Sequence, residues 1–351
     1  MRRFLERFDI VLLLTLALLF KIILIILFEY KLYPDVIRTV MVGQEYIVDK
    51  NMMSITSKTY VGPVVWYSVV RFFGIWGLKI VNLVAFVFLF IIQYMMGKKS
   101  YKRDSLLIAL FLFSFYVGTN LNLVAGEQDD FFSPLFFCLG VLIYLYRGNA
   151  FLSAFLMGLG FLFKFSAGIF FVGFVLYLLI KKKWRQVVLS TAGMVIPFLT
   201  LNLIDGFYSL NNFFYAFQAQ HGYSSWGAIL FKFFSTGIVF AVVFSLWTLF
   251  HEKSNTNLLF FIIPSLYPVY ALLNRVAYSA SYVMMFGILF FSFLLAEFLL
   301  KNRYFGKGKK RTFLIFGALV FYLVITSLIT LHNLSRDPEN AYEAISLILS
   351  R

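Results

Sequence analysis

Cysteine and charge are both scarce in this chain. Cys138 is the only cysteine among 351 residues, so no intramolecular disulfide can form, and the pattern argues against cysteine redox chemistry. Charged residues make up 13% of the chain, whereas soluble globular proteins contain about 25%. The phosphate-binding patterns GxxxxGK[ST] and GxGxxG and the nucleophile elbow GxSxG are missing. Their absence argues against the common nucleotide-driven enzymes and leaves nucleotide-free transfer open.

Apolar residues dominate instead. They form 61% of the sequence, and the mean hydropathy is +0.86. A membrane helix needs about 20 apolar residues and satisfies its own backbone hydrogen bonds, and the alternation typical of a transmembrane barrel is missing. We therefore expect an all-α polytopic membrane bundle that forms a single domain over residues 1–351. The apolar runs predict about 11 spans, near 10–28, 75–96, 105–123, 131–146, 150–163, 166–180, 187–204, 228–250, 258–273, 279–299 and 313–331.

The distribution of charge predicts the topology. Basic residues cluster in alternate connections, as in Lys98–Arg103, Lys181–Arg185 and Lys301–Arg311, and the positive-inside rule places these connections and the amino terminus in the cytoplasm. The first apolar run is expected to be a retained span, not a removed signal peptide. The net charge of +15 is then mostly topogenic, so no nucleic-acid partner is expected. Most acidic residues fall in the other connections, which are then external. We expect the protein to lie in the cell membrane.

The first external loop, residues 29–74, is long and patterned. Val36, Ile37, Val40, Met41 and Ile47 recur at helical spacing, which predicts a helix lying in the membrane interface. A second interfacial helix is expected over residues 61–73, beginning at Gly62-Pro63. Two such helices beside an acidic residue favour a covered cavity over a simple tether.

Asp35 is the acidic residue at the start of the first predicted helix of this loop, and it can be interpreted in two ways. Pro34-Asp35 before an apolar periodic run is a helix-start signal, and Asp is a favoured N-cap. A carboxylate at this place is also suited to accept a proton from a hydroxyl nucleophile as a general base.

Two other external features are candidate binding sites. The turn that contains Glu127, Gln128 and Asp129 could hold a cation through oxygen ligands, hydrogen-bond sugar hydroxyls, or simply be a solvated turn. Lys164 lies between two apolar runs, where a cation either snorkels to the interface or binds an anionic phosphate.

Arg275 has the same two readings as Lys164, and His221 could donate to a phosphate or lie in a wet loop. The histidines show no metal-ligand spacing, so no histidine metal site is expected.

Three patches of this sequence resemble the GT-C superfamily of membrane glycosyltransferases. Asp35 with Gly43, Tyr46 and Thr59-Tyr60-Val61-Gly62-Pro63 is similar to that family's first external loop. Gly126–Asp129, Tyr146–Asn149 and Gly158–Lys164 resemble its "GxxD…lylrgr…GlaxxxK" stretch. Asn274–Ser279 is similar to a segment of the catalytic subunit of GPI mannosyltransferase I.

The resemblance implies a function and a set of site residues. It implies a GT-C-like fold and transfer of a sugar, mannose above all, from a polyprenyl-phosphate donor to a lipid, glycan or protein hydroxyl with inversion. Asp35 would be the catalytic base. The substrate-binding residues would be Tyr60, Glu127, Gln128, Asp129, Lys164, His221 and Arg275. Tyr33 stands where many relatives carry the first acid of a DxD pair, which argues against a metal in this loop. No cofactor is expected either, because the lipid phosphate would itself be the activated leaving group.

A transporter or flippase for a lipid-linked saccharide is the alternative. It would also be polytopic with charges facing a cavity, but transporters often carry internal repeats and paired broken helices at mid-membrane. The sequence shows no convincing repeat, and its notable charges lie at one face. These features favour the enzyme.

Overall fold

Helices form all of the regular secondary structure in the part of the chain that the structure describes. The computed structural model describes residues 2–29, 32, 34–48, 59, 61–124, 129–219, 225–227, 230, 233, 237–252, 254–273, 280–301 and 321–329. The helices are α1 (Arg2–Leu27), α2 (Pro34–Ile47), α3 (Val61–Lys98), α4 (Arg103–Phe115), α5 (Val117–Val124), α6 (Asp129–Arg147), α7 (Ala150–Phe163), α8 (Ala167–Ile180), α9 (Trp184–Ile204), α10 (Tyr208–Ala219), α12 (Ile238–His251), α13 (Asn255–Leu273) and α14 (Ala280–Lys301). A further helical segment covers residues 321–329.

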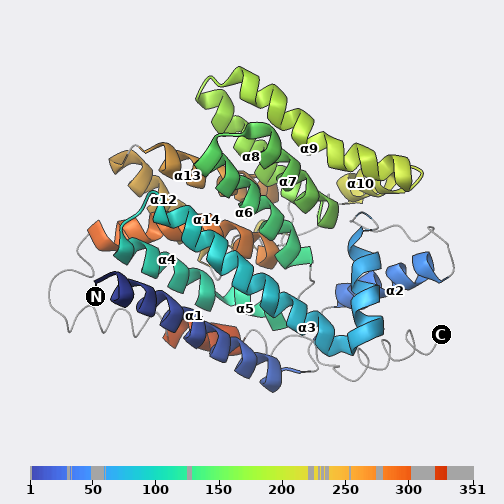
Figure 1. Ribbon diagram of the computed structural model, residues 1–351, viewed down its shortest axis with the longest axis horizontal. Coiled ribbons are helices and arrows are strands. Elements are labelled where there is room, and N and C mark those ends of the chain that lie inside the picture. The colour runs from blue at the N-terminus through green and yellow to red at the C-terminus, as the bar shows by residue number, and fades with distance from the viewer. Residues whose placement is uncertain are drawn as a thin grey trace.

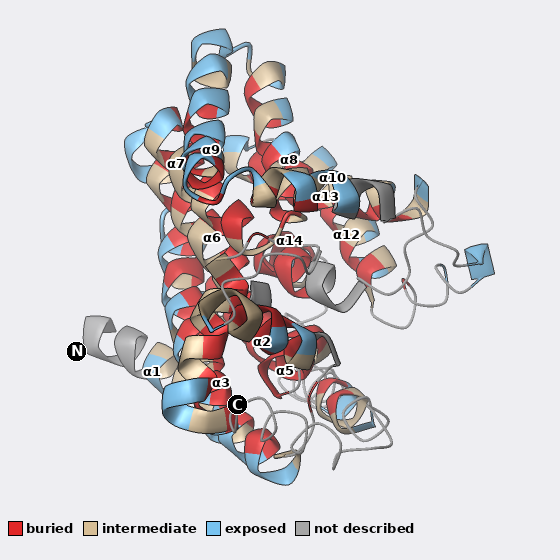
Figure 2. Ribbon diagram, turned by 90° about the vertical axis from the view of Figure 1, so that its right-hand side faces the viewer, coloured by how far each residue is buried: buried red, intermediate tan, exposed pale blue. Residues whose placement is uncertain are grey.

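Several helices are long and apolar enough to cross a membrane. Asp9–Leu27, Val61–Lys98, Trp184–Ile204 and Asn255–Leu273 pass this test singly, and α4 with α5 passes it as a pair bent by 43°. α7, α8 and α12 are shorter apolar helices. Buried residues lie in the centre of the bundle (Figure 2), and most of them are apolar. Large hydrophobic residues stay exposed elsewhere, as along α1. Apolar residues both inside and on the outer surface suit a multi-pass membrane protein, because lipid solvates the exposed apolar side chains.

α3 contains both of the elements that the sequence predicted around residue 74. Gly74 interrupts the helix with a φ of 63°, a left-handed conformation that glycine adopts without steric cost. The first segment, residues 61–73, therefore leaves the direction of the span that follows, and α2 lies beside it (Figure 1). The predicted second helix of the loop is thus this first segment of α3.

The predicted span 105–123 is not a straight helix. Tyr116 has an extended conformation, with φ −63° and ψ 137°, and it separates α4 from α5. Lys21 of α1 supplies hydrogen bonds to polar groups at the break. Its Nζ donates to the Ser114 carbonyl at 2.9 Å and to Asn120 Oδ1 at 2.8 Å. Asn120 in turn donates to the Phe115 carbonyl at 3.1 Å. The sequence pattern missed this break because the run remains apolar across it.

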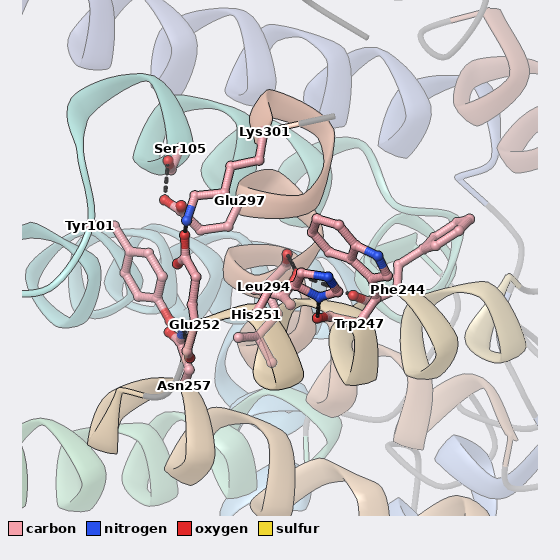
Figure 3. A network of polar contacts seen from close by, with 11 residues as sticks. Tyr101, Ser105, Phe244, Trp247, His251, Glu252, Asn257, Leu294, Glu297 and Lys301 are labelled. Atoms are coloured by element: carbon pink, nitrogen blue, oxygen red, sulfur yellow. Dashed lines mark hydrogen bonds and ion pairs between the residues drawn. The ribbon is translucent and has the colours of Figure 1, made fainter. Parts of the chain in front are cut away.

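A polar network ties the end of α14 to two connections at the same end of the bundle (Figure 3). Lys301 pairs with Glu252, and Ser105 donates to Glu297. Tyr101, between α3 and α4, donates to Asn257 Oδ1 at 2.7 Å. Burial, with a smaller effect of the Glu297 charge, raises the pKa of Tyr101 well above its usual value. Tyr101 therefore stays a hydrogen-bond donor at physiological pH.

Candidate active site

α2 packs closely on the first segment of α3. Val36 and Val40 of α2 are buried in one cluster with Trp66, Tyr67 and Val70 of α3. The two helices approach most closely at Gly43, where an added Cβ would lie 2.1 Å from the Pro63 carbonyl oxygen and 2.6 Å from Tyr67 Cβ. A glycine is therefore required at position 43. The packing fixes the start of α2, which carries Asp35, on this part of α3.

Aromatic contacts join the same segment of α3 to α6 and α7. Trp66 is 1% exposed, and its ring lies 5.0 Å from that of Phe132 and 6.0 Å from that of Phe163. Phe132 and Phe163 also contact each other, at 5.5 Å. Phe132 lies in the first turn of α6, and Phe163 is the last residue of α7. Trp66 is thus the meeting point of α3, the start of α6 and the end of α7.

The end of the first loop is bound to α7 by a hydrogen bond. The Thr59 hydroxyl donates to the Leu162 carbonyl and accepts from Val61 N at 3.3 Å. Leu162 lies in the last turn of α7, where carbonyls lack helical partners. Thr59, the residue before Tyr60, is therefore held against Leu162, which lies two residues before Lys164.

Lys164 follows α7 directly. Its backbone is extended, with φ −151° and ψ 120°, and its amide donates to the Gly160 carbonyl. The side chain is half-buried. Next to it, the Phe165 ring lies 6.2 Å from that of Phe198 in α9 and 5.4 Å from that of Phe213 in α10. Lys164 consequently lies between two aromatic clusters at one end of the bundle. One contains Trp66, Phe132 and Phe163, and the other contains Phe165, Phe198 and Phe213.

The other predicted site residues are described only in part or not at all. The backbones of Asp35 and Asp129 belong to the first turns of α2 and α6, but their side chains lie outside the described residues. Tyr60, Glu127, Gln128, His221 and Arg275 also lie outside them. The structure thus brings together the elements that carry or flank Asp35, Tyr60, Asp129 and Lys164.

The position of Asp35 differs from the expected N-cap. α2 begins at Pro34, so Asp35 is the second helical residue. Proline suits the first helical position because the amide it lacks would have no helical partner there. A carboxylate in the first turn is still favoured by the helix dipole, but the capping position itself precedes Asp35.

Two buried lysines were not identified from the sequence. Lys21 is completely buried, and Lys79 of α3, which is 2% exposed, donates to the Phe28 carbonyl at 3.1 Å at the end of α1. Lys79 thus holds the point where the chain leaves α1 for the first loop. The contacts that give these lysines their roles join residues far apart in the sequence, so no local pattern reveals them.

The described residues contain no group of three or more His, Cys, Asp or Glu side chains that could hold a metal ion.

These features define a polytopic helical protein with several helices long and apolar enough to cross a membrane. The comparison that supports this class is with the crystal structure of ArnT from Cupriavidus metallidurans bound to undecaprenyl phosphate. The two folds match with a TM-score of 0.65 over 97% of this chain and 74% of that chain, at 14% sequence identity. The all-helical GT-C-like fold expected from the sequence is thereby confirmed. No protein-family model and no curated protein sequence matches the chain.

Proposed function

We propose that this protein is an integral membrane glycosyltransferase that uses a polyprenyl-phosphate-linked sugar as its donor. The observation that carries the proposal is the meeting of α2, α3, α6 and α7 around Trp66, in a fold similar to that of a structure bound to undecaprenyl phosphate. The mannose conjugate is the proposed donor, on the sequence resemblance alone. The proposed acceptor is a hydroxyl of a lipid, glycan or protein.

Asp35 is the proposed general base. The acceptor hydroxyl gives its proton to the Asp35 carboxylate, and its oxygen forms a bond to the anomeric carbon. The bond between that carbon and the phosphate oxygen breaks on the opposite face, so the configuration inverts and polyprenyl phosphate leaves. The lipid phosphate is itself the activated leaving group, which is why the proposal includes no cofactor.

Lys164 is the proposed partner of the leaving phosphate, with Arg275 and His221 as further donors. A cation in a partly dry site stabilises developing negative charge more than it would in water. The half-buried position of Lys164 between two aromatic clusters supports this assignment. Tyr60, Glu127, Gln128 and Asp129 are proposed to hydrogen-bond the sugar and the acceptor.

One observation favours the alternative of a transporter or flippase. The α4–α5 span is broken, with a 43° bend, and broken helices are common at transporter substrate sites. Lys21 and Asn120, however, satisfy the freed carbonyls at this break, which gives it a structural explanation.

The test is a donor assay with purified full-length protein. A panel of polyprenyl-phosphate sugars is incubated with lipid and peptide acceptors, and products are identified by mass spectrometry. The proposal predicts a glycosylated acceptor, free polyprenyl phosphate and an inverted anomeric centre. Movement of intact donor across reconstituted vesicles, with no new glycosidic bond for any member of the panel, would instead establish the transporter.

A further inference from the structure

A basic surface lies at the opposite ends of α6 and α8 from the candidate active site. α8 begins just after Lys164 and ends at Ile180, and α6 begins at Asp129 and ends at Arg147. The basic turn surface, as we define it, joins the ends of α3, α6 and α8 with the start of α9, and its cations are Lys99, Arg147, Lys181, Lys182, Lys183 and Arg185.

Hydrogen bonds and a cation–π contact connect the elements that carry these cations. Lys183 Nζ donates to the Tyr144 hydroxyl at 3.1 Å, and that hydroxyl donates to Gln186 Oε1 at 3.0 Å. Lys99 donates to the Leu145 carbonyl and lies 5.2 Å from the centre of the Tyr146 ring. The two tyrosines of α6 therefore connect the α3 end of the surface to the α8–α9 turn.

The charge of this surface has no counterpart within it. Segments 94–103, 142–151 and 177–190 contain no Asp or Glu, so the cations are not neutralised from their own elements. All of them are exposed except the half-exposed Lys181. Trp184 is 65% exposed and Tyr146 48%, and such aromatic residues favour the level of lipid headgroups. The combination matches an anionic headgroup in both charge and depth.

The turn itself places a lysine where glycine is usual. Lys183 N donates to the Leu178 carbonyl and Lys182 N to the Leu179 carbonyl, the bond pattern of a Schellman motif. Lys182 takes the left-handed position with a φ of 55°. This conformation is unfavourable for every residue that has a Cβ atom, whereas glycine adopts it freely. Glycine would relieve this strain, but it would remove the positive charge at the apex of the turn.

From these observations we propose that the basic turn surface binds the phosphate of a monoanionic glycerophospholipid in the surrounding bilayer. Lys182 contributes charge at the apex of the turn, Lys183 is oriented by Tyr144, and Trp184 lies among the headgroups. This site is separate from the candidate active site, and the proposal does not depend on the enzymatic activity.

The test measures lipid affinity and stability together on the full-length protein in neutral detergent. Phosphatidylglycerol should raise the melting temperature in a saturable, salt-sensitive manner, whereas phosphatidylcholine should not. Lys182→Gly should raise the melting temperature without lipid, because it relieves strain, yet weaken phosphatidylglycerol binding about fivefold, the effect of one basic residue near an anionic surface. Lys182→Arg should bind phosphatidylglycerol as the wild type does.

The control variant is Lys301→Gln. Lys301 already pairs with Glu252, so its loss should leave phosphatidylglycerol affinity unchanged. The proposal is overturned if Lys182→Gly binds this lipid like the wild type, or if phosphatidylcholine stabilises equally. It is also overturned if inorganic phosphate raises the melting temperature by the same amount. The same holds if these cations bind undecaprenyl phosphate in place of phosphatidylglycerol.

Discussion

At the scale of single residues, the candidate active site depends on a few polar groups set among aromatic rings. Lys164 is the one proposed substrate-binding residue whose side chain the structure describes, and it is half-buried beside Phe163 and Phe165. Reduced contact with water strengthens the attraction between its ammonium group and a phosphate.

Lys164→Gln is therefore expected to weaken donor binding. The loss of a charge-assisted hydrogen bond of about 1.5–3 kcal/mol corresponds to a rise in KM of roughly 10- to 100-fold. Steady-state kinetics with the accepted donor measure this change. Lys164→Arg should retain most of the affinity, and Lys102→Gln in the exposed α3–α4 connection should behave like the wild type. If both kcat and KM are unchanged in Lys164→Gln, this lysine does not contact the phosphate.

At the scale of elements, two features shape the molecule. They are the contact of α2 with α3 and the hydrogen bonds of Lys21 at the α4–α5 break. Each replaces regular helix geometry with a specific polar or close contact.

Gly43→Ala should disturb the first of these features. The new methyl group would overlap the Pro63 carbonyl, and overpacking of this kind costs about 1–3 kcal/mol. We expect a lower melting temperature and reduced transfer, because α2 carries Asp35. Gly227→Ala is a suitable control, since nothing lies within 4 Å of a Cβ at that position. Equal melting temperatures for the two variants would argue against the close α2–α3 contact.

Lys21→Met should weaken the second feature. It leaves the Ser114 carbonyl and Asn120 Oδ1 without their donor, at about 1–3 kcal/mol for each unsatisfied group. Unfolding in mixed micelles measures the loss. Thr15→Val removes a hydrogen bond that an exposed side chain of the same helix makes to its own backbone and should have little effect. If both variants unfold alike, Lys21 does not hold the break.

The sequence predicted the elements better than it predicted their junctions. Long apolar runs identified α1, α6, α9 and α13, because crossing a membrane requires such runs, and the helical spacing of residues 36–47 identified α2. The break at Tyr116 escaped detection because hydropathy does not report which carbonyls lose their partners. The contact of Trp66 with Phe132 and Phe163 joins residues far apart in sequence, so no local pattern contains it. Asp35 and Lys164 were predicted as site residues through the family resemblance, and their roles stay predictions.

At the scale of the whole molecule, the candidate active site and the basic turn surface lie at opposite ends of the bundle. The elements that carry Asp35, Asp129 and Lys164 meet at one end, and the basic turn surface lies at the other. The positive-inside rule predicts that the basic end faces the cytoplasm.

Cysteine labelling can test that orientation. Cys138 is fully buried, so Cys138→Ser provides a background for single introduced cysteines. In intact cells an impermeant thiol reagent should label Val48→Cys, just after α2, and should label Lys102→Cys only after the membrane is opened. The reverse pattern would place the candidate active site in the cytoplasm.

The most direct test of the account is the turnover of Asp35→Asn with the donor that the wild type accepts. The substitution keeps the size of the side chain and removes the base, so transfer should fall by about 10²–10⁴-fold, while the affinity for undecaprenyl phosphate stays within about twofold, a change of less than 0.5 kcal/mol. Glu45→Gln, which removes a carboxylate from the same helix, should turn over like the wild type. Wild-type turnover by Asp35→Asn would contradict the account, because the acceptor would then be activated without this carboxylate.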